Sequence, residues 1–216
     1  MVNVDFSRSG GRIVLGQRPS RIYRHRLPAQ NPRAIREYYD RLSRSYGMLY
    51  GPEQAMKHEK VLAIMEERMY SVLIDIGCGD GMLLSKVRGR SSLQVGLDFS
   101  PRMLEEAKCV LGESGNLVLG DARHLPFRDG VADCIVSISL SDRGNIEALA
   151  SEVARIARYD TTVLLSVIHP DGSLLTKVPG LKLLDRSLLS TRETLLVLSK
   201  HRPMLKNEWR RMDGGR

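Results

Sequence analysis

The chain has 216 residues and a formal net charge of +8, with 42% hydrophobic and 27% charged residues. This length accommodates one ordinary α/β domain with short extensions, and the composition is typical of a globular protein. No segment approaches the roughly 20 apolar residues that a membrane helix needs, and residues 1–12 lack the pattern of a secretory signal. We therefore expect no membrane association and a cytoplasmic location.

The charge is distributed unevenly along the chain. Residues 1–36 hold eight arginines and one acid, and residues 200–216 hold six lysines and arginines and two acids. Residues 37–199 carry a net charge of −3, so the basicity belongs to the two ends. The cysteines Cys78, Cys109 and Cys134 are too widely spaced for a zinc knuckle or a disulfide framework, and no metal site is expected.

The amino-terminal part of the chain predicts an arm followed by helices. Residues 1–30 lack a helical period and are dense in arginine, which indicates a basic flexible arm or hairpin. Asn31 followed by Pro32 is typical of a helix start, and tyrosines recur at helical spacing behind it. Gly51 and Pro52 are expected to separate this helix from a second one over residues 61–69. These helices form a short extension before the main domain.

From residue 71 to residue 199, short apolar segments alternate with amphipathic ones. This alternation predicts βαβ units and a doubly wound, mainly parallel sheet. Five strands are expected, at SVLIDIG, LQVGLDF, NLVLGD, VADCIVSIS and TTVLLSVI, and residues 181–199 are expected to form a closing antiparallel hairpin. We therefore predict a seven-stranded α/β domain over residues 31–199, followed by a basic tail over residues 200–216.

A glycine-rich segment, Asp75-Ile76-Gly77-Cys78-Gly79-Asp80-Gly81, lies between a predicted strand and a predicted helix. Glycines at such a turn let the backbone approach a ligand closely and leave N–H groups pointing at it. Met82 stands where a dinucleotide fingerprint would need a third glycine, so an NAD-type ligand is disfavoured. A tight turn without a ligand is the alternative interpretation.

Two more acids, Asp98 and Asp121, end the next two predicted strands. Because the carboxyl ends of parallel strands form the ligand-binding edge of an open sheet, Asp75, Asp98 and Asp121 are expected to lie together there. Asp98 is placed to accept both hydroxyls of a ribose, and Asp121 to accept a hydrogen bond from an adenine amino group. A helix cap or loop acid remains the alternative for each of them alone.

These segments resemble the class I S-adenosylmethionine (SAM) dependent methyltransferases over roughly residues 33–199. VLIDIGCGDG is similar to the first motif of that family, GLDFSPRML to the second, and GDARHLPFRDGVADCIVSIS to the third and fourth. The resemblance implies SAM as the cofactor. The cofactor-binding residues that it implies are Tyr39, Tyr46, Asp75, Gly77, Cys78, Gly79, Gly81, Asp98, Phe99, Met103, Asp121, Ala122 and Ser137.

Within this resemblance each group of residues has a role. The glycine loop wraps the methionine part of SAM, and Asp75 helps to hold its amino group. Phe99 and Met103 flank the adenine, whose edge is read by Asp121 and the Ala122 amide. Ser137 to Ser139 border the methyl-donor site, and Tyr39 and Tyr46 supply the aromatic rings that close over the cofactor.

Candidate catalytic residues follow the fourth and fifth predicted strands. Asp142 and His169 lie where a methyl acceptor would sit, and either is a candidate base or acceptor anchor. A helix N-cap is an equally consistent role for Asp142, and a plain loop position for His169. No Asn/Asp-Pro-Pro-aromatic segment follows the fourth strand, and no cysteine follows a proline, so methylation of exocyclic amines and of cytosine C5 is disfavoured.

The basic ends favour RNA, as tRNA or rRNA, as the acceptor, because lysines and arginines neutralise phosphates. The sequence leaves open a small-molecule methyltransferase of the quinone or lipid-precursor kind, and a non-catalytic RNA-binding subunit. YYDRLSRSYGMLYGPEQ is similar to archaeal methyltransferases related to tRNA wobble-uridine and small-subunit rRNA enzymes, which implies a small zinc-binding protein activator. The third predicted strand, Asn116 to Leu119, is expected at a sheet edge where such a partner would dock.

Overall fold

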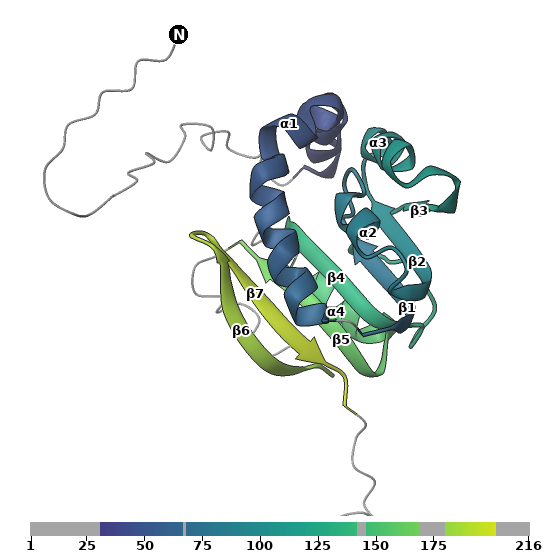
Figure 1. Ribbon diagram of the computed structural model, residues 1–216, viewed down its shortest axis with the longest axis vertical. Helices are drawn as coiled ribbons and strands as arrows, with labels where there is room; N and C mark the ends of the chain where they lie inside the picture. Colours follow the sequence, from purple (N-terminus) through teal and green to yellow (C-terminus); the bar gives the residue numbers. More distant parts are fainter. Residues whose placement is uncertain (1–30, 67, 142–145, 169–179, 202–216) are drawn as a thin grey trace, which may run out of the picture.

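The computed structural model describes residues 31–66, 68–141, 146–168 and 180–201. Its centre is a seven-stranded sheet with the strand order β3-β2-β1-β4-β5-β7-β6 (Figure 1). The parallel strands are β1 (Tyr70–Ile76), β2 (Ser91–Asp98), β3 (Asn116–Leu119), β4 (Ala132–Ser141) and β5 (Ala157–Val167). β7 (Glu193–Ser199) runs antiparallel to β5 and to β6 (Lys182–Ser190). This confirms the predicted mainly parallel sheet, its closing hairpin and the edge position of the third strand.

Helices cover both faces of the sheet, as the doubly wound prediction requires. α1 (Pro32–Met65), α2 (Met82–Lys86) and α3 (Pro101–Leu111) lie on one face, and α4 (Ile146–Ile156) lies on the other (Figure 1). The side chains of Asn31 and Ser100 cap α1 and α3, and each cap is followed directly by a proline. These caps satisfy backbone N–H groups that the first turn of a helix leaves unpaired.

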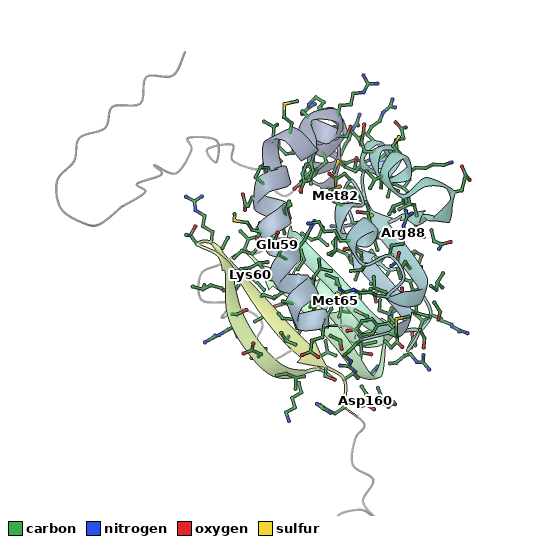
Figure 2. All side chains as sticks on the ribbon, in the orientation of Figure 1. Glu59, Lys60, Met65, Met82, Arg88 and Asp160 are labelled. Carbon is green, nitrogen blue, oxygen red and sulfur yellow. The ribbon has the colours of Figure 1, made fainter. Side chains whose placement is uncertain are left out.

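The strands of the sheet alternate their side chains between two buried clusters. In β1, Ile74 packs in the cluster that contains α4, whereas Leu73 packs in the cluster that contains Val61 and Met65 of α1. The exposed face of α1 carries Glu59 and Lys60 (Figure 2). A fully buried aliphatic side chain such as that of Leu73 or Ile74 stabilises the fold by about 1.5–3 kcal/mol relative to an exposed one. The sheet therefore forms a firm base for residues at its carboxyl edge.

The prediction of two amino-terminal helices is wrong, because α1 is one continuous helix with Pro52 in its interior. Pro52 has no N–H group and gives up one hydrogen bond of the helix, which normally bends or breaks it. Figure 1 shows that the amino-terminal half of α1 changes direction rather than ending. The buried side chains that follow, including Val61 and Met65, hold the second half against the sheet.

Several predictions fall outside the described residues. These are the arm at residues 1–30, the tail from residue 202 onward, and the candidate catalytic residues Asp142 and His169. Among the helices that the structure describes, none combines the length and the apolar character needed to cross a membrane.

Candidate cofactor and acceptor site

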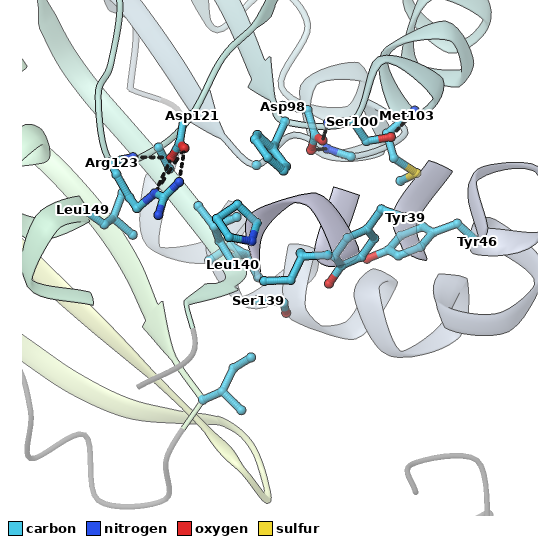
Figure 3. Close-up of a pocket in the computed structure, with 18 residues that line it drawn as sticks. Tyr39, Tyr46, Asp98, Ser100, Met103, Asp121, Arg123, Ser139, Leu140 and Leu149 are labelled. Carbon is cyan, nitrogen blue, oxygen red and sulfur yellow. Dashed lines mark hydrogen bonds and ion pairs between the residues drawn. The ribbon is translucent and has the colours of Figure 1, made fainter. Parts of the chain in front are cut away.

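A cleft opens at the carboxyl ends of β1, β2 and β4, beneath the amino-terminal half of α1 (Figure 3). It has two lobes of about 180 and 140 Å³, whose walls share Tyr46, Gly77, Gly79 and Ile138. The larger lobe is lined by residues that follow β2, β3 and β4, and the smaller lobe by the glycine loop and the middle of α1. The acids predicted at three strand ends are thus brought to one site.

The glycine loop needs its glycines for two reasons. Gly77, Gly79 and Gly81 have φ angles of +78°, +55° and +76°, in the left-handed region that other residues rarely adopt. A Cβ atom on Gly77 would also lie 2.8 Å from a methyl group of Leu140. The backbone N–H groups of Gly77 and Cys78 donate to the carbonyl oxygen of Leu97, at 2.7 and 3.0 Å, which fixes the loop on β2. The loop is therefore preformed for close approach of a ligand.

Asp98 is held in place by two backbone N–H groups. Its Oδ2 accepts from Gly79 N at 2.9 Å, and its Oδ1 accepts from Ser100 N at 2.8 Å. Burial raises the pKa of this carboxyl, and the two N–H groups oppose part of that effect. Asp98 also lines the larger lobe, so its remaining lone pairs face the cleft and suit the hydroxyls of a ribose.

Asp75 is almost fully buried, at 3% exposure, and lines the smaller lobe. Burial, followed by the negative charges of Asp98 and Asp80, raises its pKa to about 7. No described lysine or arginine forms an ion pair with it. A buried carboxylate without a cationic partner is costly, and it favours a ligand that brings a positive group such as an ammonium.

Asp121 also reaches the larger lobe, but its carboxylate already has a partner. Arg123 donates from Nε to both carboxylate oxygens, at 2.9 and 3.1 Å, and forms an ion pair through NH2 at 2.5 Å. The Arg123 guanidinium holds the pKa of Asp121 below its ordinary value. The backbone N–H of Arg123 also donates to Asp121 Oδ1 at 2.9 Å, so the two carboxylate oxygens already accept four contacts, and an adenine amino group would have to replace one of them.

The tyrosines of α1 form an aromatic row over the cleft. Tyr39 and Tyr46 line the larger lobe, with their ring centroids 6.5 Å apart (Figure 3). Burial, followed by Tyr39, raises the pKa of Tyr46, so its hydroxyl stays protonated. Asp40 anchors this part of α1 by accepting a 2.5 Å hydrogen bond from the Ser100 hydroxyl at the start of α3. Contact of both tyrosines with a cofactor stays a prediction.

The other predicted cofactor residues are distributed unequally. Phe99, Met103 and Ala122 line the larger lobe. Cys78 borders the smaller lobe, but its thiol is buried beneath Gly96, and its backbone N–H and carbonyl bond to Leu97 and Gly81, so it shapes the loop rather than offering a free group to a ligand. Gly81 starts α2 behind the loop. Ser137 is buried at 1% exposure and is absent from the lining of both lobes, whereas Ser139 lines the larger one.

Sequence reasoning missed three polar residues of the smaller lobe. Gln54 and His58 of α1 and Lys86 of α2 all line it. Burial, followed by the charges of Lys86 and Lys57, lowers the pKa of His58 to about 4, so this imidazole is neutral near pH 7. Lys57 and His58 share the buried face of α1 with Val61 and Met65, and polar residues at such positions were a detectable signal.

Comparison with known proteins identifies this kind of site. Residues 74–165 match a family described as a methyltransferase domain. The protein MJ1252 of Methanocaldococcus jannaschii is 30% identical over 136 residues, which are 62% of this chain and 52% of that protein. The mouse 18S rRNA (guanine-N(7))-methyltransferase is 39% identical over 79 residues, 36% of this chain and 28% of that enzyme. Demethylmenaquinone methyltransferase of Staphylococcus aureus is 33% identical over 106 residues, 47% of this chain and 43% of that enzyme.

Two solved structures share the fold. One is a chain from the complex of the Haloferax volcanii Trm112 methyltransferase activator with a methyltransferase, with a TM-score of 0.66, 16% identity, and coverage of 79% of this chain and 99% of that chain. The other is DhpI in its SAH complex, with a TM-score of 0.63, 14% identity, and coverage of 77% and 95%. At these identities the likeness concerns the fold alone.

The match to the family and the acids at the strand ends agree. Residues 74–165, slightly less than half of the chain, match a methyltransferase domain, and the fold is shared with a chain from a methyltransferase complex and with DhpI in its SAH complex. The site fits SAM on its own features, because a buried unpaired carboxylate suits the ammonium and Asp98 suits the ribose. The chain spans about half the length of MJ1252 and less of the other two relatives, so the acceptors of these relatives do not by themselves identify the acceptor of this chain.

Proposed function

We propose that this protein transfers a methyl group from SAM to RNA, with tRNA or rRNA as the acceptor. The observation that carries the proposal is the charge of the helix over the cleft. Arg33, Arg36, Arg41 and Arg44 lie on the same half of α1 as Ile35, which lines the larger lobe. Glu37 and Asp40 form ion pairs with Arg33 and Arg36, so this half of α1 carries a net charge of +2. Basic side chains beside the opening suit a phosphate backbone, and in the sequence they directly follow the strongly basic residues 1–30.

The residues of the cleft divide the work of binding. Asp75 would hold the ammonium of SAM, Asp98 the ribose, and Asp121 with Ala122 the adenine edge, while Phe99 and Met103 pack beside the ring. Bound SAM supplies a methyl group on a positively charged sulfur, which an acceptor displaces in line. Most of the acceleration of such a step comes from holding the two reactants in close, aligned contact. The tyrosine row of α1 supports this by covering the cleft and excluding water.

Relatives support two acceptor classes. The matched rRNA methyltransferases favour RNA, whereas the matched demethylmenaquinone methyltransferases favour a quinone-like small molecule. Apolar side chains in the larger lobe, including Leu140, Leu149 and Ile168, give the second class some support. The basic half of α1 makes RNA the better choice, because a small apolar acceptor needs no cationic surface. A non-catalytic RNA-binding subunit is disfavoured, because the acids and glycines of the cofactor site are all present.

A small protein activator belongs to the same proposal. β3 lies at the edge of the sheet and carries Leu119 at 54% exposure. An edge strand presents unpaired backbone groups, to which a partner strand can be added. The fold is shared with a chain from a complex that contains the Trm112 activator, which supports a partner of this type. A cytoplasmic location is also proposed, and it agrees with three cysteines that are all free.

Methyl incorporation tests the proposal directly. Purified protein, with and without a candidate zinc-binding activator, is incubated with labelled SAM and separate RNA, protein, lipid and small-molecule fractions. We expect label in the RNA fraction alone. Label in a quinone or lipid fraction would replace the RNA acceptor by a small molecule, and binding of SAM without any transfer would favour a non-catalytic subunit.

A further inference from the structure

A buried charged cluster lies beneath the floor of the larger lobe and has no role in holding the cofactor. Lys57 of α1 and Glu193 of β7 form an ion pair at 2.6 Å, with side chains only 5% and 3% exposed. The Lys57 ammonium also binds Glu53 at 2.8 Å and the Ser139 hydroxyl at 2.8 Å. All three of its donors are therefore directed at described partners. Burying such a pair costs desolvation energy, so packing alone does not explain it.

The cluster converges on one residue of β4. Ser139 N donates to Ser166 Oγ at 2.7 Å and to Glu193 Oε1 at 2.9 Å. The Ser139 backbone has a φ angle of +58°, in the left-handed region, and lies within an irregular part of the pairing between β4 and β5. A residue other than glycine keeps such a conformation only where its surroundings impose it, and such strain gathers at functional sites. Lys57 and Glu193 supply those surroundings.

Ser139 is also the member of the cluster that reaches the cleft. It lines the larger lobe, whereas neither Lys57 nor Glu193 lines either lobe. Figure 3 shows Ser139 across the cavity from Asp98 and close to the side of the tyrosines. The cluster thus fixes the Ser139 hydroxyl in the wall of the cleft opposite Asp98.

The hydrogen bonds of the Ser139 hydroxyl determine what it offers to a ligand. The hydroxyl has one proton and two lone pairs. Its proton is directed to the Glu193 carboxylate, at 3.0 Å, and one lone pair accepts from Lys57. The second lone pair accepts from Gln54 Nε2 at 3.4 Å, the longest of these contacts. A ligand that engages Ser139 would therefore take the place of Gln54, and it would have to present an N–H or O–H donor rather than an acceptor.

We propose that the Ser139 hydroxyl orients the methyl acceptor by accepting a hydrogen bond from an N–H or O–H group beside the methylated atom. Lys57 and Glu193 are positioning residues that fix this hydroxyl. The inference rests on the proposed methyl transfer and adds a requirement on the acceptor, which must carry a donor next to its reactive atom. Nucleobases carry such donors, and so do the hydroxylated rings of quinone precursors.

The first test compares Ser139→Ala and Ser139→Gly with the wild-type chain, using total RNA from cells that lack the enzyme and labelled SAM. Both variants remove the hydroxyl, but glycine also relieves the positive φ angle. Loss of one hydrogen bond predicts a fall in kcat/KM for RNA of about three- to tenfold in both variants. The Kd for SAM should stay within about twofold of the wild-type value, because Asp75 and Asp98 are unchanged.

Thr161→Val is the matched control. Thr161 is fully buried, and its hydroxyl donates to the Ala132 carbonyl oxygen at 2.9 Å near the opposite end of β4. Its loss should lower the melting temperature as the loss of a buried hydroxyl does, while kcat/KM for RNA remains at the wild-type value. Equal losses of activity in Thr161→Val and Ser139→Ala would assign the effect to general destabilisation and overturn the proposal.

A second test addresses the positioning pair. The double variant Lys57→Met with Glu193→Gln removes both charges of the buried pair. A single substitution would leave the other charge unpaired in the interior. We expect the double variant to reduce kcat/KM for RNA about as much as Ser139→Ala, and the triple variant to show no further loss, because residues acting through one contact are not additive. Additive losses would show that the pair acts independently of Ser139.

The outcomes separate this inference from the proposed function. If the wild-type protein labels RNA and Ser139→Ala is fully active, the inference fails and the function stands. If RNA remains unlabelled while a small-molecule fraction takes the label, the RNA assignment fails, and the same variants are measured on that fraction. If no fraction is labelled by the wild-type protein, with or without an activator, both proposals fail.

Discussion

At the scale of single residues, Asp98 and Asp133 offer a matched comparison. Each carboxylate accepts two backbone N–H groups, Asp98 from Gly79 and Ser100, and Asp133 from Ser71 and Val72 at 2.8 Å. Only Asp98 lines the cleft. Asp98→Ala should therefore weaken SAM binding by roughly 1.5–3 kcal/mol, the contribution of charge-assisted hydrogen bonds to the ribose.

Isothermal calorimetry with SAM checks this expectation, and Asp133→Ala is the control. Both variants lose two hydrogen bonds to backbone groups, so the melting temperature is measured for each as a folding control. The affinity of Asp133→Ala for SAM should equal that of the wild-type protein. Unchanged affinity in Asp98→Ala would refute the ribose assignment.

The raised pKa of Asp75 predicts opposite effects on stability and binding. Because its folded-state pKa is about 7 and thus above the ordinary value, the neutral form is favoured, and stability is lost as the pH rises through about 7. Asp75→Asn mimics the neutral form, so it should raise the melting temperature more at pH 8 than at pH 6. The same variant should bind SAM weakly at both values, because it lacks the charge that pairs with the ammonium.

Wild-type protein provides the reference for this pH dependence. Its affinity for SAM should decline as the pH falls below about 7, because binding then requires deprotonation of Asp75. Calorimetry in buffers of different ionisation enthalpy should detect the released proton. Equal wild-type affinity at pH 6 and pH 8 would argue that Asp75 does not pair with the cofactor.

The residues that could be predicted were those whose signal is local. The glycine loop and the acids at the ends of β1, β2 and β3 can each be predicted from a few neighbouring residues, because the strand, its terminal acid and the following turn are contiguous in the sequence. The Lys57–Glu193 pair joins α1 to β7, and no local sequence pattern around either residue predicts that the two form an ion pair. The sequence places Ser139 at the end of the fourth strand, but its left-handed backbone conformation and its contacts with that pair could not be predicted from neighbouring residues.

At the scale of elements, the strand order followed from the alternation of segments, but α1 did not follow from the rule for proline. Gly51 and Pro52 are strong local signals for a helix end. They were overridden because Lys57, Val61 and Met65 bury one face of the second half of α1 against the sheet. The bent helix that results places Tyr39 and Tyr46 over the cleft while its second half remains in the core.

The two edge strands of the sheet give a matched test of the activator surface. Leu119 of β3 and Leu184 of β6 are each 54% exposed. Leu119→Lys should reduce binding of a candidate activator and raise the solubility of the isolated chain, because an edge lysine opposes strand addition. Leu184→Lys introduces the same charge on the opposite edge and should leave activator binding unchanged.

Co-purification and light scattering measure these two effects. The Kd for SAM serves as a folding control and should be the same in both variants. If Leu184→Lys disrupts the complex and Leu119→Lys does not, the partner binds at β6, and the β3 assignment is wrong. A soluble isolated chain that is fully active alone would remove the need for an activator.

At the scale of the whole molecule, the chain combines a net positive charge of +8 with residues 37–199 that carry −3. Attraction to RNA must therefore come mainly from the ends of the chain and from the arginines at the start of α1. If about four to six of these side chains contact phosphates, RNA binding should weaken steeply with salt, with a log-log slope near −0.7 to −0.9 per contact. Asp75 and Asp98, which are proposed to hold SAM, are not among these side chains, so the affinity for SAM should be much less sensitive to salt.

Removal of residues 1–30 tests this separation, because it deletes six arginines. The truncated protein should bind RNA more weakly and with a shallower salt slope, as measured by fluorescence anisotropy, while its affinity for SAM stays nearly unchanged. A full-length variant with the same six arginines replaced by glutamine is the matched control, because it removes the charge and keeps the length. Equal slopes for the wild-type, truncated and glutamine forms would show that the arm does not bind RNA, and a small-molecule acceptor would then become the better explanation of the site.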